Sequence, residues 1–183
     1  MRGPAALALG MLATPAAAQM SPPVPPAVIP TQCTGAVHGQ FDFWIGNWNV
    51  FRTNDAQSLV GTSTVDKIYN GCAIRETWSP FTMLLGGSLN TWDKHRGKWR
   101  QIWIDADNSL VDFEGGLADG RMVLTGLWRG LFGAGKDALM RMSYAPLADG
   151  SVRQVGETSI DGGKTWQAAF DFTYRRRPDF PHP

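Results

Sequence analysis

The sequence predicts an all-β fold, an antiparallel up-and-down β-barrel of about ten strands. Turn-forming Gly, Asn and Asp recur at short intervals from Phe41 onward, and segments of strand composition lie between them. The last of these segments alternates: one face carries Trp166, Ala168, Phe170, Phe172 and Tyr174, and the other carries Gln167, Asp171, Thr173 and Arg175. This period of two is typical of a sheet with one buried face. Residues 41–177 show no long helical stripe and no alternation of strands with helices, which excludes an α/β fold.

The expected strands follow one another with short connections. In chain order they span residues 41–52, 58–69, 72–79, 87–92, 98–105, 109–115, 120–127, 138–145, 151–159 and 165–175. The separators include Asn70-Gly71 and Asp149-Gly150, dipeptides that tolerate the positive φ angles of tight hairpins. So many sequential hairpins favour an up-and-down barrel over a sandwich, because a Greek key needs longer crossovers.

The N-terminal residues have the composition of an export signal. Arg2 supplies a positive start, an apolar run follows, and small residues lead up to Ala18. We expect cleavage after Ala18 and a periplasmic or secreted mature chain; the alternative is an Ala-rich helix of the domain. We expect a signal peptide at residues 1–18, a Pro-rich segment at 19–40, a single barrel domain at 41–177 and a C-terminal tail at 178–183.

Charge and composition exclude several classes of partner. The chain has 17 Lys and Arg against 16 Asp and Glu, a formal net charge of +1, so no basic surface for nucleic acid is expected. Two Cys and three His are too few for a multi-Cys zinc module, and no metal site is expected. The apolar run of the leader is too short to anchor the chain in a bilayer, and we also expect no membrane span in the mature chain.

The two cysteines fit an oxidising compartment. Cys33 precedes the first expected strand, and Cys72 follows the turn at Asn70-Gly71. We expect a disulfide bond between them, with two separate buried thiols as the alternative. The chain has no C-x-x-C motif, so a thioredoxin-type redox pair is not expected.

Several motifs together resemble the DUF1579-type family of bacterial proteins. They are FDFWIGNWNV at 41–50, GCAIRETW at 71–78, SLNTWD at 88–93, WRQIWID at 99–105 and DGSVRQVGETSIDGGKTW at 149–166. That family is similar to the calycin group of lipocalin-like barrels, in which a Gly-x-Trp on the first strand closes the barrel floor. The resemblance implies this structural role for Gly46 and Trp48, and it implies no particular activity. Gly lets the chain bend sharply and Trp fills a narrow end, which agrees with that role.

Two further resemblances concern structural and cofactor roles. Residues 159–166 resemble the Asp-box of sialidase propellers, which implies that Asp161 accepts backbone N–H bonds within a hairpin and that Trp166 packs beneath it. The barrel is also similar to nitrobindins, whose haem needs a cavity-facing histidine near the C-terminal strand. None of the three histidines lies in an expected strand body, so no cofactor is expected.

The candidate ligand-binding residues are polar or aromatic side chains within expected strands. They are Glu76, Trp78, Gln101, Trp103, Asp105, Glu114 and Gln154. Such a mixture is typical of small-ligand pockets. The alternative is that the strand glutamates form ion pairs with strand arginines or face outward. The inward face stays open, because Ile102 and Ile104 compete with Gln101 and Trp103, and a one-residue shift reverses the faces.

These observations predict an exported protein that binds a partly apolar small molecule in the barrel interior. One alternative is an enzyme that uses Glu76, Asp105 or Glu114 as an acid or base; binding without catalysis is the favoured prediction. Another is a protein-interaction module, including a homodimer, that uses residues 128–137. This Gly-rich stretch is the longest connection, and it predicts either a flap over the barrel mouth or a wide surface hairpin.

Overall fold

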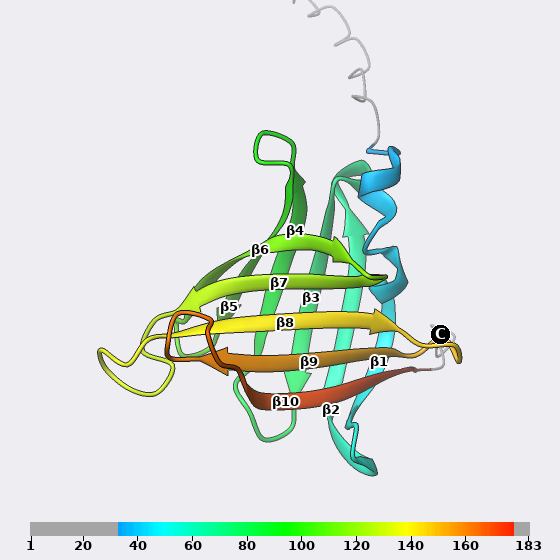
Figure 1. The fold of residues 1–183 in the computed structure, drawn as a ribbon. Coiled ribbons are helices and arrows are strands. Elements are labelled where there is room, and N and C mark those ends of the chain that lie inside the picture. The colour runs from blue at the N-terminus through cyan, green and yellow to red at the C-terminus, as the bar shows by residue number, and fades with distance from the viewer. Residues whose placement is uncertain (1–32, 178–183) are drawn as a thin grey trace, which may run out of the picture. The chain divides into compact units, whose positions relative to one another are not determined.

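A computed structural model describes residues 33–177, which form a closed antiparallel barrel (Figure 1). Its ten strands are β1 (Gly46–Arg52), β2 (Asp55–Ile68), β3 (Ala73–Pro80), β4 (Gly86–Asp93), β5 (Lys98–Asp105), β6 (Leu110–Ala118), β7 (Arg121–Trp128), β8 (Ala138–Pro146), β9 (Val152–Ser159) and β10 (Gln167–Arg176). Three short 3₁₀ turns accompany them: η1 (Ala36–Gly39), η2 (Asp42–Trp44) and η3 (Tyr69–Gly71). The predicted all-β barrel is confirmed. The expected signal peptide and C-terminal tail lie outside the described residues.

Each strand pairs with its neighbours in sequence, and pairing of β1 with β10 closes the ring. In that closing pair Trp48 lies opposite Arg176 and Arg52 lies opposite Phe172. This is the up-and-down order that sequential hairpins predict. The strands run between two different ends of the barrel. The end at which β1 begins, with η1, η2 and η3, is called the closed end here, and the end at which β1 finishes is called the open end.

The first expected strand, 41–52, is wrong over its first five residues. Residues 42–44 form the η2 turn, in which the Trp44 N–H donates to the Phe41 carbonyl at 3.2 Å. The turn stacks the Phe41 and Trp44 rings, with centroids 4.9 Å apart, and both side chains are fully buried. An extended strand would place residues 41 and 44 on opposite faces, so burying both rings in one end of the barrel requires the turn.

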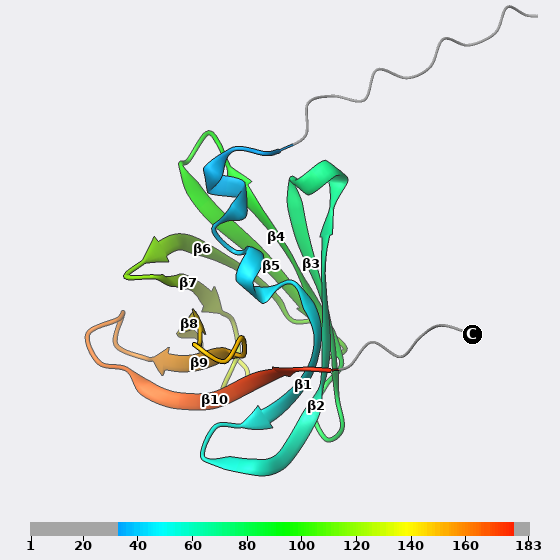
Figure 2. The same ribbon diagram turned by 90° about the vertical axis from the view of Figure 1, so that its right-hand side faces the viewer.

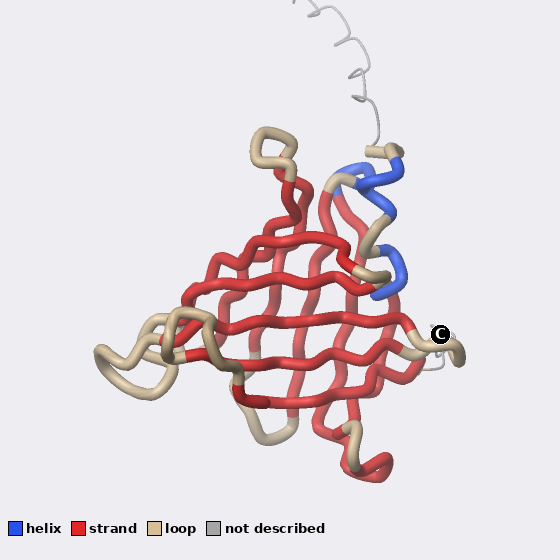
Figure 3. Tube along the Cα trace, in the orientation of Figure 1, coloured by secondary structure: helices blue, strands red, loops and turns tan. Residues whose placement is uncertain are grey.

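Large aromatic side chains fill the closed end of the barrel. Figure 2 looks toward this end and shows η1 and η2 lying across the ring of strands, and Figure 3 shows the helical turns gathered there. Trp48 is fully buried on β1 and donates its indole N–H to the Trp44 carbonyl at 2.9 Å. The Arg176 guanidinium lies 4.5 Å over the Trp48 ring and donates to the Ile45 carbonyl at 3.1 Å. Gly46 has a φ of 149°, which brings its backbone against the Arg176 side chain where a Cβ would clash.

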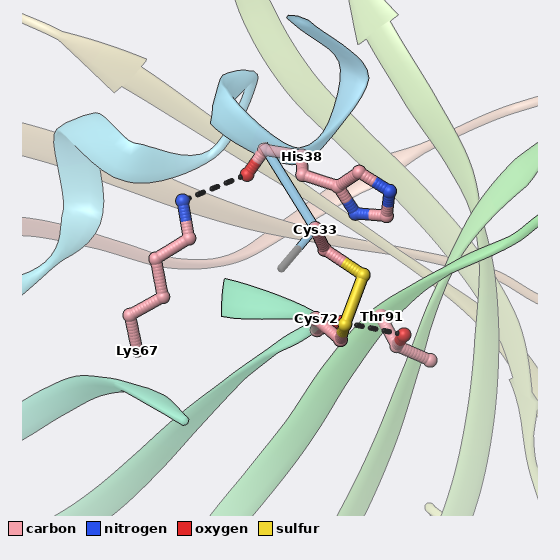
Figure 4. Close-up of a disulfide and its surroundings, with 5 residues drawn as sticks. All are labelled: Cys33, His38, Lys67, Cys72 and Thr91. Carbon is pink, nitrogen blue, oxygen red and sulfur yellow. Dashed lines mark hydrogen bonds between the residues drawn. A yellow bond between two sulfur atoms is a disulfide. The ribbon is translucent and has the colours of Figure 1, made fainter. Parts of the chain in front are cut away.

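A disulfide bond joins Cys33 to Cys72 across 39 positions of sequence (Figure 4). Two further hydrogen bonds hold the same region: Thr91 donates to the Cys72 carbonyl at 2.8 Å, and Lys67 donates to the His38 carbonyl at 3.1 Å. The bridge therefore ties the start of the described chain to the connection between β2 and β3. A crosslink that closes a loop of this length stabilises a fold by about 3–4 kcal/mol.

The β9–β10 hairpin contains the Asp-box-like segment. Asp161 accepts backbone N–H bonds from Lys164 and Thr165, both at 3.0 Å, and a hydroxyl bond from Thr165 at 2.6 Å. These donors, Thr165 foremost, hold the pKa of Asp161 well below its usual range. Trp166 donates its indole N–H to the Gly163 carbonyl at 3.0 Å. Asp161 therefore organises the hairpin, and its oxygens are occupied by neighbouring donors.

Candidate functional site

A cavity of about 620 Å³ lies inside the open-end half of the barrel. Its lining combines apolar and aromatic side chains with a few polar groups: Arg52, Glu76, Trp78, Met83, Leu84, Trp103, Asp105, Trp128, Met142, Tyr144, Gln154, Ala169, Phe170, Phe172 and Tyr174. Arg52, Asp105 and Trp128 are the last residues of β1, β5 and β7, so the cavity reaches the open end. The aromatic rings form its walls, and the buried polar groups lie deeper in the barrel.

Strand alternation explains which side chains reach the cavity. On β3 the inward residues are Ile74, Glu76 and Trp78, and all three are buried. On β5 the inward face carries Gln101, which is 1% exposed, while Ile104 on the opposite face is 54% exposed. Strand β5 therefore turns its polar and Trp positions inward and its isoleucine positions outward, which resolves the alternative left open by the sequence.

Glu76 is the acidic group at the deep side of the cavity. It is only 5% exposed, and its two carboxyl oxygens accept hydrogen bonds from Ser63 on β2 and Ser88 on β4, each at 3.1 Å. Burial raises the pKa of Glu76 to about 7, because the two hydroxyl donors offset only part of the cost of removing the charge from water. The carboxyl is therefore poised between its neutral and charged forms near neutral pH.

Neutral polar side chains extend from this carboxyl across the barrel. Asn90 donates to the Ser88 hydroxyl at 3.0 Å. Gln101 in turn donates to the Asn90 side-chain oxygen at 2.8 Å and to the Tyr144 hydroxyl at 3.2 Å. These groups lie on β4, β5 and β8, so the network links the adjacent strands β4 and β5 to β8, which lies three strands away from β5 in the ring. Each buried amide has a partner, which satisfies its hydrogen-bonding capacity inside the barrel.

Two tyrosine hydroxyls complete the deep side. Gln154 on β9 donates to the Tyr144 hydroxyl at 3.0 Å and accepts from the Tyr174 hydroxyl at 2.6 Å. Burial, together with the nearby charge of Glu76, raises the pKa of both tyrosines, so both remain neutral hydroxyls. We call the set Glu76, Gln101, Tyr144, Gln154 and Tyr174 the polar floor.

The structure brings together most of the candidate residues and separates two. Five of the seven line the cavity: Glu76, Trp78, Trp103, Asp105 and Gln154. Gln101 lies beneath the lining, within the polar floor. Glu114 lies on the outer face of β6, where Lys98 donates to it at 2.6 Å and lowers its pKa. It takes no part in the cavity, because β6 turns Val111 and Phe113 inward instead.

Several lining residues were not among the sequence candidates. Phe170, Phe172 and Tyr174 share the apolar face of β10, and the alternation of this strand was the signal that marked them as buried. Trp128, Met83 and Leu84 come from the ends of strands and from a loop, where no periodicity exists to reveal them.

The connection between β7 and β8 borders the cavity through Trp128. Leu131 packs against the core, whereas Phe132 is 53% exposed. Asp137 accepts the Gly130 backbone N–H at 2.8 Å and closes the base of the loop. The loop thus contributes one wall residue to the cavity and one exposed ring to the open end.

Metal and histidine chemistry find no support at this site. Within residues 33–177, no three or more His, Cys, Asp or Glu side chains gather in a way that could hold a metal ion. His38 lies in η1, and His95 lies in the turn between β4 and β5, both at the closed end. The same part of the chain contains no helix long and apolar enough to cross a membrane.

No protein-family model matches the chain, and no curated protein matches it either.

Proposed function

We propose that the protein binds a small, partly apolar molecule in the barrel cavity. The observation that carries the proposal is a chamber of about 620 Å³ with aromatic walls that ends on a polar floor. Ligand sites usually have volumes of about 300 to 1,000 Å³, mostly apolar walls and a few convergent polar groups.

The unfilled volume favours a binding role over a purely structural one. Protein interiors are normally packed as densely as organic crystals, and unfilled space costs stability. In the closed-end half the fully buried Phe41 and Trp44 rings stack on each other, with centroids 4.9 Å apart. The open-end half instead keeps Trp78 and Trp103 along the wall of a cavity. A barrel with a cavity of this size loses packing energy around it, and a ligand that occupies the cavity would restore that energy.

The perturbed carboxyl favours a second candidate, an enzyme that uses Glu76 as a general acid or base. A group with a pKa of about 7 in a pocket can exchange protons at neutral pH. Catalysis also needs a nucleophile or a second acid–base group nearby. The described groups that face Glu76 are the hydroxyls of Ser63, Ser88, Tyr144 and Tyr174. Burial keeps both tyrosines neutral, and the two described histidines lie at the closed end, where neither activates a serine. Binding is therefore the leading proposal.

The site belongs, in this proposal, to an exported protein of the DUF1579-type family. The Cys33–Cys72 disulfide supports export, because such bonds persist in oxidising compartments. Cleavage after Ala18 would produce the mature chain.

Isothermal titration calorimetry with naphthalenemethanol, a neutral aromatic probe, tests the binding function. Ala169 lines the cavity near its mouth, whereas the adjacent Ala168 does not, and both are exposed on β10. We expect Ala169→Trp to weaken binding by about tenfold, which corresponds to about 1.4 kcal/mol. Ala168→Trp is the matched control and should leave the affinity unchanged. Equal affinities in all three proteins, or no binding to the wild type, would contradict the proposal.

A further inference from the structure

We infer that the ligand of this cavity is an organic cation, a molecule whose protonated amine pairs with Glu76 and whose apolar body lies between the aromatic walls. This inference rests on the proposed binding function and specifies its ligand class. It follows from the hydrogen-bonding capacity of the polar floor, the position of the charged residues and the nature of the walls.

Glu76 has unused acceptor capacity that faces the cavity. A carboxylate offers about four acceptor positions on its two oxygens. Ser63 and Ser88 occupy one position on each oxygen, and no other donor to Glu76 is found among residues 33–177. The remaining positions are available to a molecule that brings its own N–H groups. A protonated amine supplies both these donors and the charge that a buried carboxylate needs.

Within the described part of the chain, no Lys or Arg neutralises Glu76. Arg52 is the single Lys or Arg in the cavity lining, and it is an exposed residue at the open end of β1. Glu76 pairs with Val65 on β2, and Val65 pairs with Gly46 on β1. Arg52 lies six residues beyond Gly46 along β1. Six residues correspond to roughly 20 Å of strand. The charge opposite Glu76 is therefore left for a ligand to supply.

The remaining polar floor disfavours an anionic ligand. The Tyr174 hydroxyl donates to Gln154, and the Gln154 amide donates to Tyr144. The Tyr144 hydroxyl in turn donates to the Gln101 side-chain oxygen and to the Met142 sulfur, each at 3.5 Å, so these donors are used within the protein. An anion would meet the Glu76 carboxyl without a free donor beside it. Like charges in a buried site repel strongly, and an unpaired buried anion is costly.

The walls suit a cation with an apolar body. Trp78 stacks on Phe172 with centroids 6.1 Å apart, and Phe170 stacks on Phe172 at 4.8 Å. Trp103 and Trp128 lie along the same cavity. The faces of such rings attract ammonium groups, most strongly where water is excluded.

Binding of such a molecule exchanges one proton for one ligand charge. In the free protein the raised pKa keeps a substantial fraction of the Glu76 carboxyl protonated at neutral pH. When the ammonium binds, that proton leaves to solvent and the carboxylate pairs with the ligand, so the cavity stays neutral. The groups that face Glu76 from the neighbouring elements are the Ser63, Ser88, Tyr144 and Tyr174 hydroxyls; the charged residues at the mouth are Arg52 and Asp105.

Three probes with the same ring system test the inference: naphthylmethylamine, naphthalenemethanol and naphthoate. At pH 7.5 we expect the amine to bind the wild type about tenfold or more tightly than the neutral alcohol, the range of a charge-assisted hydrogen bond. Glu76→Gln, which keeps the shape of the side chain, should abolish this preference, so that the amine and the alcohol bind with similar affinities. Glu114→Gln, on the outer surface, is the matched control and should behave as the wild type. Thermal unfolding verifies that each variant is folded.

The pH dependence gives a second readout. The amine remains protonated between pH 5 and 7, but Glu76 must release its proton to pair with it. We expect the affinity for the amine to fall by up to about tenfold per pH unit below pH 7 in the wild type, and to stay level in Glu76→Gln.

The outcomes separate the ligand class from the binding function. If the alcohol binds as tightly as the amine, or if the preference survives Glu76→Gln, the cavity binds ligands but the cation inference is wrong. If naphthoate binds most tightly, Arg52 recognises the ligand and the inference is again wrong. If none of the three probes binds, both the ligand class and the proposed function fail.

Discussion

The two ends of this barrel use the same ten strands for opposite purposes. At the closed end Trp44 and Trp48 are fully buried, and a disulfide bond ties down the start of the described chain. At the open end the same sheet surrounds a cavity of about 620 Å³, and loop residues such as Phe81 and Leu85 are exposed. The difference shows that a single closed sheet can enclose a cluster of buried aromatic rings at one end and a cavity at the other.

Strand β10 illustrates how one element serves both halves. Its Tyr174 lies beside Trp48, with ring centroids 6.3 Å apart, and donates to Gln154 in the polar floor. Four residues earlier, Phe170 forms part of the cavity wall. The side chains have similar sizes and the same inward direction. Their different roles follow from depth in the barrel, because the closed end supplies the aromatic turn residues that fill the space around Tyr174.

The largest expected effect is at the closed end. Trp48→Ala removes a fully buried indole and its hydrogen bond to Trp44, and it also removes the ring under Arg176. We expect the free energy of unfolding to fall by about 3–5 kcal/mol. Urea denaturation followed by circular dichroism measures this change. A loss below about 1 kcal/mol would mean that the closed end does not carry the stability assigned to it.

An intermediate effect is expected at the boundary between the halves, and it depends on pH. The pKa of Glu76 rises from 4.5 to about 7 on folding. Between these values the folded protein holds a proton that the unfolded chain has released, so the free energy of unfolding falls as pH rises through this window. Above pH 7 the buried ionised carboxylate lowers the free energy of unfolding by about 3 kcal/mol. Below pH 4.5 both states are protonated and this loss disappears.

Glu76→Gln removes this titrating group, so comparing the stability of the variant with that of the wild type measures its contribution. We expect the variant to gain stability relative to the wild type by about 3 kcal/mol between pH 4.5 and 7.5, as urea denaturation at a series of pH values would show. Glu114→Gln, on the outer surface, should show the same dependence of the free energy of unfolding on pH as the wild type. A stability difference that does not change with pH would contradict the assignment of Glu76 as a buried group with a raised pKa.

The smallest effect on stability is expected at the mouth. Leu84 is half-exposed in the loop between β3 and β4 and contributes to the cavity lining. Leu84→Ser should change the free energy of unfolding by no more than about 0.5 kcal/mol, while weakening the binding of naphthalenemethanol several-fold. Calorimetry together with denaturation separates the two quantities. A large loss of stability without any loss of affinity would contradict the prediction that Leu84, at the open end, serves binding rather than stability.

The sequence predicts the strands well because turn chemistry is local. Dipeptides such as Asp149-Gly150 occupy the tight connections, and strand bounds agree to within a few residues except at 41–45. There the spacing of Phe41 and Trp44 is compatible with a strand, and only the need to fill the barrel end selects a turn.

The inward face was harder to predict, because alternation defines two faces without saying which is inside. On β5 the apolar Ile104 is exposed and the polar Gln101 is buried, opposite to what hydrophobicity alone would suggest. The polar floor explains this inversion, since the Gln101 amide finds partners in Asn90 on the adjacent strand and in Tyr144, which lies 43 positions away in sequence. Glu114 faces outward by the same alternation that places Phe113 inside.

The seam between β1 and β10 separates this barrel from an open meander. Every other strand pair joins neighbours in sequence, whereas Arg176 and Ile45, at this seam, are 131 positions apart. Hairpins close quickly and long loops close slowly, so we expect the meander to assemble from local pairs and the seam to form last. Because β1 and β10 lie side by side, a short linker could connect the end of β10 to the start of β1, and the chain could be opened instead at one of the open-end hairpins. Such a circular permutation would keep every pair of neighbouring strands. It would change the order in which the strands pair during folding, but not the barrel that results.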